Sequence, residues 1–82
     1  MRRSLLLVLA ICLTGCGGDS DTFTLYRNSA SDKDMRIHVA SFDARDGGPG
    51  YNSGNCEIAR GLFQNQEGIL VRYWCEKGRY RS

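Results

Sequence analysis

The stretch of sequence that decides the fold is residues 56–75, which read CEIARGLFQNQEGILVRYWC. Four apolar side chains in its first part have the spacing of one helix face: Cys56, Ala59, Leu62 and Phe63. Its last part, extended to Glu76, alternates between two faces as a strand does, with Cys75 on the face expected to meet the helix. Between the two parts, Gly68 suits the left-handed conformation in which helices often end. These residues predict a helix followed by a strand over residues 69–76.

Two further strands are expected before the helix. In residues 22–27, Phe23 and Leu25 alternate with polar side chains, which predicts the first strand. Residues 28–34 are rich in Asn, Ser and Asp, whose side chains bond to neighbouring backbone groups and favour a turn. Residues 35–44 form the second expected strand. Its two faces hold Ile37 and Val39 on one side and His38, Ala40 and Phe42 on the other.

The segment between the second strand and the helix predicts a loop. Residues 45–54 are rich in glycine, which is entropically costly to order, and contain Pro49, which cannot donate a hydrogen bond to a strand ladder. Ser53 or Asn55 is expected to cap the start of the helix.

These elements predict an α+β domain with the order strand, strand, helix, strand. A right-handed crossover through the helix makes the second and third strands parallel, while the turn makes the first strand antiparallel to the second. The expected architecture is a β-β-α-β domain with a three-stranded mixed sheet packed on one helix. Whether the first or the second strand is central stays open.

One face of that sheet has no helix to cover it. The alternation of the strands places a candidate partner surface there, made of His38, Phe42, Leu70, Arg72 and Trp74. Exposed aromatic and arginine side chains often anchor protein interfaces. The same face could instead be covered by residues near the start of the domain, by the tail near Tyr80, or by a second copy of the chain.

The start of the chain has the pattern of an export signal. Arg2 and Arg3 precede an apolar run at residues 5–13, and the small residues Thr14 and Gly15 follow it. The run is too short to span a bilayer, which takes about 20 apolar residues. The sequence therefore predicts a signal peptide that is removed.

The four residues Leu13, Thr14, Gly15 and Cys16 resemble the lipobox of bacterial lipoprotein precursors. That resemblance implies cleavage before Cys16, lipidation of its sulfur and attachment to an envelope membrane, since two or more acyl chains anchor stably. It also implies, from Gly17 in place of Asp at the next position, delivery to the outer membrane, facing the periplasm. The expected parts are a removed signal peptide, a lipidated tether and one folded domain, at residues 1–15, 16–21 and 22–82.

The remaining cysteines predict a disulfide. Cys12 leaves with the signal peptide and Cys16 carries lipid, so Cys56 and Cys75 form an even pair in an oxidising compartment. A structural zinc site needs four ligands, and two cysteines with the single His38 do not supply them. We therefore expect a disulfide between Cys56 and Cys75, no metal site and no cofactor.

Charge and motif content argue against two classes of activity. The chain has 11 Lys and Arg against 9 Asp and Glu, and removal of Arg2 and Arg3 leaves the mature chain neutral, which gives a nucleic-acid partner no support. His38 could act as a base, but no motif places a nucleophile beside it, so no catalytic residue and no small-molecule substrate are assigned. Contact of anionic lipid with the basic residues near the end of the chain stays open: Arg72, Lys77, Arg79 and Arg81.

Residues 55–57 and 73–80 look similar to segments of short uncharacterised proteobacterial lipoproteins, a resemblance that implies no activity. The expected function is a non-enzymatic binding or structural module, held on a membrane through Cys16, with an envelope protein as the candidate partner. The alternative is an inhibitor or exclusion factor against an incoming hydrolase or phage component, with residues 45–54 as the inserted loop.

Overall fold

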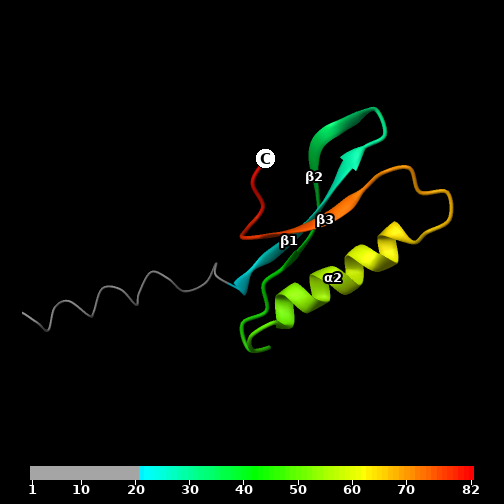
Figure 1. The fold of residues 1–82 in the computed structure, drawn as a ribbon. Coiled ribbons are helices and arrows are strands. Elements are labelled where there is room, and N and C mark those ends of the chain that lie inside the picture. The colour runs from blue at the N-terminus through cyan, green and yellow to red at the C-terminus, as the bar shows by residue number, and fades with distance from the viewer. Residues whose placement is uncertain (1–20) are drawn as a thin grey trace, which may run out of the picture.

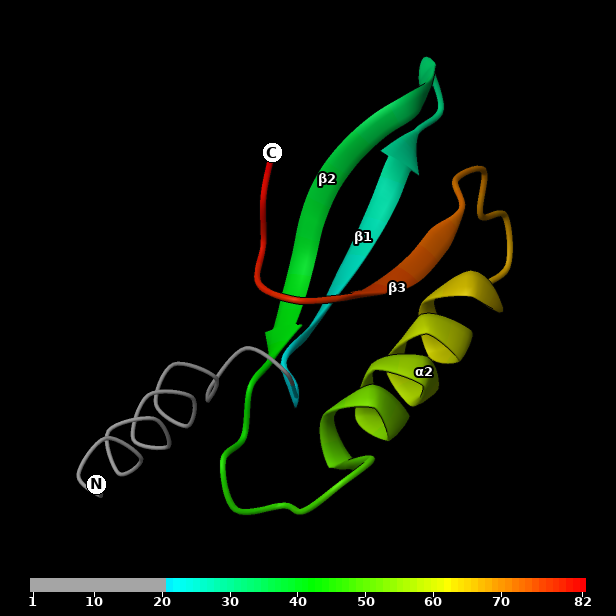
Figure 2. The same ribbon diagram turned by 60° about the vertical axis from the view of Figure 1, so that its left-hand side comes forward.

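The computed structural model describes residues 21–82, which contain three strands and one long helix (Figures 1 and 2). The elements are β1 (Phe23–Ser29), β2 (Asp32–Phe42), α2 (Tyr51–Gln64) and β3 (Tyr73–Lys77). The predicted signal peptide, the lipidated Cys16 and most of the predicted tether lie outside the described residues. Between residues 21 and 82, no helix combines the length and the apolar character needed to cross a bilayer.

The sheet is antiparallel throughout, and β1 is its central strand. The strand order is β2-β1-β3, and β1 pairs antiparallel with both of its neighbours. The predicted order of elements is confirmed, but the predicted mixed sheet is wrong, because β3 pairs with β1 and not with β2. The strands β2 and β3 still run in the same direction, with β1 between them (Figure 2).

The burial of β1 explains its central position. Its side chains are buried on both faces of the sheet, with Leu25 0% and Tyr26 1% exposed. By contrast, β2 begins with three exposed charged residues, Asp32, Lys33 and Asp34. Charged side chains suit a strand whose outer edge stays unpaired, because they discourage pairing with another chain. The strand with apolar character on both faces therefore occupies the middle of the sheet.

The helix α2 begins earlier than predicted. It starts at Tyr51, so residues 51–54, which were predicted as loop, form its first turn. Neither Ser53 nor Asn55 caps the helix; the capping position is Gly50, and no side chain provides a capping hydrogen bond. Gly50 has a φ of 80°, a left-handed conformation that glycine adopts without the steric cost that a Cβ would add.

Hydrogen bonds of one buried side chain hold this end of α2 in place. The side chain of Asn52 is buried and accepts a hydrogen bond from the backbone N–H of Ala44 at 3.0 Å. Its amide nitrogen donates to the carbonyl oxygens of Ala44, at 3.0 Å, and of Asp21, at 2.8 Å. The first turn of α2 is thereby joined both to the end of β2 and to the residue that leads into β1.

Other boundaries differ by a few residues. The strand β3 begins at Tyr73 instead of residue 69, and β2 begins at Asp32, so the hairpin turn is confined to residues 30–31. Gly68 lies in the turn after α2 with a φ of 78°, the left-handed conformation that was predicted for it.

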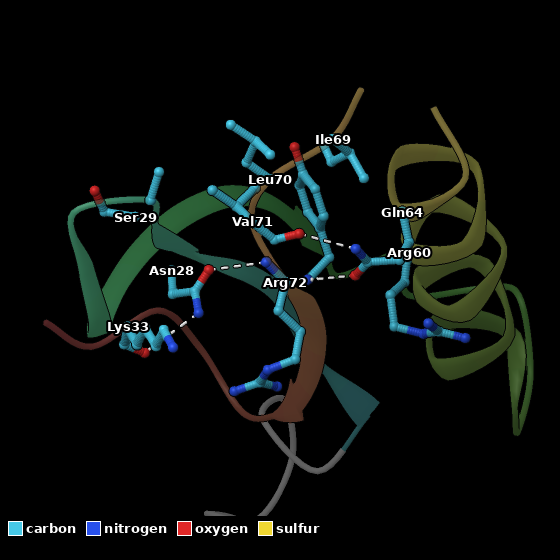
Figure 3. A pocket seen from close by; sticks show the side chains of 11 residues that line it. Asn28, Ser29, Lys33, Arg60, Gln64, Ile69, Leu70, Val71 and Arg72 are labelled. Atoms are coloured by element: carbon cyan, nitrogen blue, oxygen red, sulfur yellow. Dashed lines mark hydrogen bonds between the residues drawn. The ribbon is translucent and has the colours of Figure 1, made fainter. Parts of the chain in front are cut away.

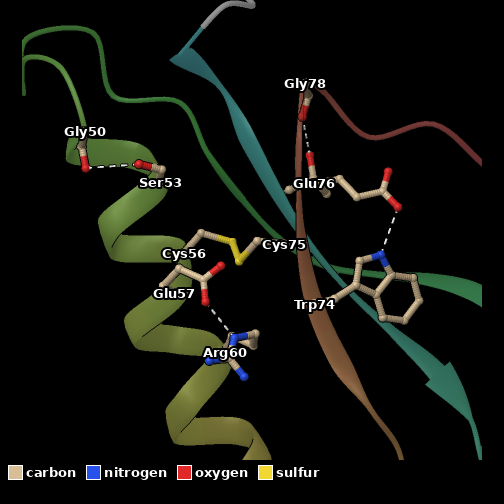
Figure 4. The surroundings of a disulfide bond; sticks show 10 residues. Gly50, Ser53, Cys56, Glu57, Arg60, Trp74, Cys75, Glu76 and Gly78 are labelled. Carbon is tan, nitrogen blue, oxygen red and sulfur yellow. Dashed lines mark hydrogen bonds and ion pairs between the residues drawn. A yellow bond between two sulfur atoms is a disulfide. The ribbon is translucent and has the colours of Figure 1, made fainter.

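The helix packs on one face of the sheet and is joined to it by the predicted disulfide (Figure 4). Cys56 and Cys75 are bonded, with their Cα atoms 6.2 Å apart. Cys56 is fully buried, as is Leu25, which pairs with Cys75 across the sheet. Farther along the helix, Phe63 stacks on Tyr73 with ring centroids 5.2 Å apart. A covalent bond and an aromatic pair thus hold α2 to β3.

The predicted core face of α2 was wrong at one position. Leu62 is 70% exposed, whereas Asn52 and Cys56 are the buried residues of the helix. The core face is centred on these two residues, and Leu62 lies about a third of a turn away from it at 100° per residue.

The other face of the sheet is covered by the end of the chain. The backbone carbonyl of Gly78 accepts a hydrogen bond from the Thr24 hydroxyl at 2.8 Å, which holds the start of the tail against β1. The ring of Tyr80 then packs near that of Tyr26, with centroids 6.0 Å apart. Of the covers that the sequence left open, the tail near Tyr80 lies on this face within residues 21–82.

Candidate functional site

The predicted partner surface is divided among three places in the structure. Trp74 and His38 lie on the helix-free face, where both pair with the same residue of β1. Arg72 lies just before β3, with its guanidinium carbon 4.8 Å from the Trp74 ring centroid. Phe42 lies on the helix-covered face, and Leu70 lies in the connection between α2 and β3. The five residues therefore do not form the single surface that was predicted.

A β-bulge explains the position of Phe42. Consecutive residues of β1 pair with Ala40 and then with His38, which leaves Val39 without a partner. The bulge breaks the alternation of the strand. Phe42 consequently lies opposite Phe23 on the face that α2 covers, and His38 lies on the other face.

His38 has a hydroxyl neighbour that the sequence did not reveal. Its Nε2 lies 2.9 Å from the Ser41 Oγ, and its ring centroid lies 4.8 Å from that of Tyr80. Both His38 and Ser41 are exposed, and no carboxylate within residues 21–82 is hydrogen-bonded to the imidazole. A Ser–His nucleophile needs an orienting group and an enclosed site. Within residues 21–82, the exposed His38 and Ser41 have neither of these features.

An ion pair spans the helix-free face from β2 to β3. Arg36 donates to the carboxylate of Glu76. The same carboxylate accepts from the Trp74 indole Nε1 at 2.8 Å (Figure 4). These two hydrogen bonds, with that of Arg36 the stronger, hold the pKa of Glu76 below its usual range, although partial burial opposes them. The hydrogen bond to Glu76 is also the main cause that raises the pKa of Arg36. The guanidinium of Arg36 lies over the Tyr26 ring, 4.3 Å from its centroid.

Leu70 and Arg72 belong to a cleft at the end of the domain opposite Asp21 (Figure 3). We call it the distal cleft; its volume is about 760 Å³. Three separate segments line it: residues 28–30 with Lys33, Arg60 with Gln64, and residues 69–73.

Two amide side chains hold the walls of the distal cleft together. Gln64 donates to the carbonyl of Val71 at 2.8 Å and accepts from the backbone N–H of Tyr73 at 2.7 Å. Asn28 accepts from the backbone N–H of Arg72 at 2.8 Å. These amides are satisfied by the backbone and shape the cleft, so any ligand would be recognised by other side chains.

The distal cleft is basic. Its lining contains Lys33, Arg60 and Arg72 and no Asp or Glu, and Figure 3 shows Arg72 between the other two. Arg60 is paired with Glu57 at 2.7 Å, whereas neither Lys33 nor Arg72 has a salt bridge within residues 21–82. Leu70 at the rim is 82% exposed. The cleft thus offers two cations beside an apolar side chain, an arrangement suited to an anionic group with an apolar neighbour.

A second, smaller depression lies on the other side of α2. It has a volume of about 480 Å³ and runs between the helix and the end of β2. The large apolar side chains of its lining are Phe42, Tyr51, Ile58 and Leu62. Three of these residues belong to the helix and are exposed, and we call them the α2 stripe: Tyr51, Ile58 and Leu62.

Sequence reasoning missed Lys33, Arg60 and Gln64 as parts of one site. They come from the hairpin and the helix and meet only after folding. The one local signal was the four-residue spacing of Arg60 and Gln64, which places them on the same side of a helix.

Comparison with known proteins gives no relative for this chain: no family model, curated protein or solved structure matches it. In the part of the chain that the structure describes, no group of three or more His, Cys, Asp or Glu could hold a metal ion. The geometry and charge of the distal cleft are therefore the main indications of function.

Proposed function

We propose that this chain is a bacterial lipoprotein whose folded domain binds an acidic partner at the distal cleft while lipid on Cys16 holds it to an envelope membrane. The observation that carries the binding role is the pair of cations without salt bridges, Lys33 and Arg72, beside the exposed Leu70. The anchor is supported by the sequence Leu-Thr-Gly-Cys at residues 13–16 after an apolar run. The proposed role is binding, without catalysis.

An acidic segment of an envelope protein fits the chemistry of the cleft. The planar guanidinium of Arg72 lies over Trp74, which orients it and leaves its N–H groups able to pair with a carboxylate. Lys33 adds a second positive charge, and an apolar side chain next to the carboxylate would pack on Leu70. Exposed charges of this kind contribute more to specificity and association rate than to affinity.

The distal cleft and the tether lie at opposite ends of α2. Asn52 in the first turn of the helix binds the carbonyl of Asp21, whereas Gln64 at its last position lines the cleft. The helix rises by about 1.5 Å per residue, so these two positions are about 18 Å apart along its axis. An anchored domain would therefore present the cleft away from its point of attachment.

The inhibitor alternative has weaker support. The loop expected to insert into a hydrolase, residues 45–54, is shorter in the structure because α2 begins at Tyr51. It also lies at the end of the domain that holds Asp21, beside the tether. An inserting loop at that end would have to work next to the membrane surface.

Photo-crosslinking in intact cells tests the binding role. A photoreactive residue replaces Leu70 in the cleft, and a matched control replaces Leu62, another exposed leucine on the other side of the helix. We expect a specific envelope protein to be captured at residue 70 and not at residue 62. Equal capture at both positions, or no protein captured at residue 70, contradicts the proposal.

Charge reversal identifies the chemistry of that capture. Lys33→Glu and Arg72→Glu should each lower the captured amount about tenfold, which corresponds to a loss of about 1.4 kcal/mol. Arg45→Glu reverses an exposed arginine in the loop before α2 and should leave capture unchanged. A Tm close to that of the unmodified protein, measured by thermal denaturation of each purified variant, verifies that it folds. Full capture by Arg72→Glu would exclude an acidic partner at this cleft.

A further inference from the structure

The α2 stripe is an apolar surface that the fold leaves uncovered. Tyr51, Ile58 and Leu62 are 49%, 63% and 70% exposed, the largest exposed apolar side chains of the helix. At 100° per residue they lie within about 40° of one another around the helix axis. Their side of the helix is separate from the core face, which contains Asn52 and Cys56. The stripe is therefore an outward-facing row of apolar side chains, with the amide of Asn55 between Tyr51 and Ile58.

Charged residues are few along the depression beside the α2 stripe, although Arg45 and Asp46 precede Gly47, which lies against the Tyr51 ring. The depression itself is lined by one charged residue, Asp43, which forms an ion pair with Arg79 at 3.9 Å. On the opposite flank, Gly54 and Gly61 have open space where a Cβ would be, so no side chain stands above the stripe there. A flat apolar medium could therefore contact Ile58 and Leu62 without removing an unpaired charge of the depression from water.

The chain that precedes β1 limits how far this helix can move from the membrane, if Cys16 carries the proposed lipid. The carbonyl of Asp21 is hydrogen-bonded to Asn52, one residue after Tyr51. Five residues lead from Cys16 to Asp21, and an extended chain covers at most about 3.6 Å per residue, or about 18 Å in total. Asp21, to which the first turn of α2 is hydrogen-bonded, therefore stays within about 18 Å of the lipid anchor.

We infer that the α2 stripe lies on the surface of the bilayer that holds Cys16, an inference that rests on the proposed lipid anchor. Tyr51 is nearest the tether and has the amphipathic character of residues enriched at membrane interfaces. Ile58 and Leu62 continue the contact along a helix that lies in the membrane plane. Three side chains bind weakly alone, but the tether makes the contact intramolecular and raises its occupancy.

A second copy of the chain fits the α2 stripe less well. Stable protein interfaces engage about 20 to 30 residues on each side. The stripe offers three residues beside the small lining of one depression. A bilayer has no such requirement for matching residues, so it is the partner that the exposed area suits.

Contact through the α2 stripe fixes the direction in which the distal cleft points. Arg60 is nine residues after Tyr51 and therefore lies about 180° from it around the helix. Arg60 lines the distal cleft, so the cleft is on the side of α2 opposite the stripe. A domain lying on its stripe would present the cleft toward the periplasm.

Depth-dependent fluorescence quenching in vesicles tests this orientation. The full-length lipidated protein is reconstituted into phosphatidylcholine vesicles with brominated acyl chains, which quench tryptophan near the hydrocarbon. Trp74 is the only tryptophan, so Leu62→Trp and Leu70→Trp are each combined with Trp74→Phe. The residue at 62 should lose about half of its fluorescence, because interfacial helices bury their apolar face about 5–10 Å. The residue at 70 and the natural Trp74 should be unquenched.

Three other results would each contradict the inference for a different reason. If tryptophan at residue 70 is quenched as strongly as tryptophan at residue 62, the predicted orientation of the domain is wrong. Quenching of the natural Trp74 in the unmodified protein would place the helix-free face on the bilayer. This measurement does not depend on the folding of any variant. A photoreactive residue at position 62 that captures a second copy of the chain, and not lipid, identifies a dimer interface instead.

Vesicle flotation separates this inference from the proposed function. Protein that floats with the vesicles but shows no quenching at residue 62 keeps its anchor and loses only the bilayer contact. Protein that does not float has no lipid anchor, and the proposed function and this inference then fail together. Quenching at residue 62 that disappears at high salt would also contradict an apolar contact, because salt screens only charge-based binding.

Discussion

The two faces of the sheet are buried by different means, although they share the central strand β1. On one face, Leu25 is covered by a helix that a disulfide joins to β3. On the other face, Tyr26 is covered by a short tail that is held by rings and hydrogen bonds. The difference shows how a domain of this size, with a single long helix among its described residues, can bury a strand on both sides.

The tail-covered face depends on directional polar contacts. The backbone N–H of Arg81 donates to the Tyr26 hydroxyl at 3.2 Å, and the guanidinium of Arg36 donates to the carbonyl of Arg81 at 3.2 Å. Arg36 also pairs with Glu76, so the tail is connected to a group that titrates. The helix-covered face should therefore respond to reductant, and the tail-covered face to acid.

The largest expected effect comes from removing the covalent bond of the helix-covered face. Cys75→Ser should lower the free energy of unfolding by about 3 kcal/mol, because the loop closed by the disulfide no longer restricts the unfolded chain. In a domain this small, that loss lowers the Tm by roughly 12 °C or more. Thermal denaturation without reductant measures the shift. Reductant should affect the unmodified protein alone, and equal Tm values for the two proteins would show that the disulfide has no stabilising role.

A smaller effect is expected from the tail. Tyr80→Ala removes the ring that packs near Tyr26 and His38, and should lower the free energy of unfolding by about 1 to 1.5 kcal/mol. The hydroxyl of Tyr80 makes no hydrogen bond within residues 21–82, so Tyr80→Phe should change stability by less than about 0.5 kcal/mol. Urea denaturation of both variants compares them. An alanine variant as stable as the phenylalanine variant would mean that the tail does not contribute to burial of this face.

The smallest effect is expected at Glu76, and it depends on pH. Because the pKa of Glu76 is lowered in the folded state, its ionised form stabilises the fold above the ordinary carboxyl pKa of 4.5. This contribution is lost as the pH falls through the lower pKa of the folded protein. Glu76→Gln should therefore cost about 0.5 to 1 kcal/mol at pH 7, the range for a partly exposed ion pair.

Denaturation at two pH values checks the assignment of Glu76. The stability difference between Glu76→Gln and the unmodified protein should be present at pH 7 and nearly absent at about pH 3. The exposed Glu67, changed to Gln, is the matched control and should leave stability nearly unchanged at both pH values. A difference that is the same in acid and at neutral pH would assign the effect to packing and not to charge.

The elements and the disulfide could be predicted because their signals are local. A helical spacing around Cys56 and a strand alternation around Cys75 lie close together in the sequence, and each places its cysteine on a face that must meet the other. Strand neighbours are not local. The alternation of side chains in β1 and β2 does not depend on which of these two strands pairs with β3. The sheet was therefore predicted as mixed, whereas it is antiparallel.

The candidate site was predicted less well, for two physical reasons. A bulge at Val39 reverses the alternation of side chains, and no glycine or proline in the sequence marks it. The prediction therefore placed Phe42 on the wrong face of the sheet. The distal cleft is assembled from three segments, so Leu70 and Arg72 could be singled out while Lys33 and Arg60 could not. The periodicity of apolar residues predicts single helices and strands well, but it does not predict surfaces that several segments form together.

The place of β1 in the sheet also sets the order in which the domain can form. When the chain is made from its N-terminus, β1 and β2 are completed early. The second edge of β1 cannot pair until residues 73–77 have been made, and its two faces cannot be covered until α2 and the tail are present. Until then, the hairpin has unpaired backbone groups along β1, whose Leu25 and Tyr26 side chains are buried only in the complete fold, and such an edge is a template for aggregation. Both edges of β1 can therefore be paired, and both of its faces covered, only after residues 73–82 have been made.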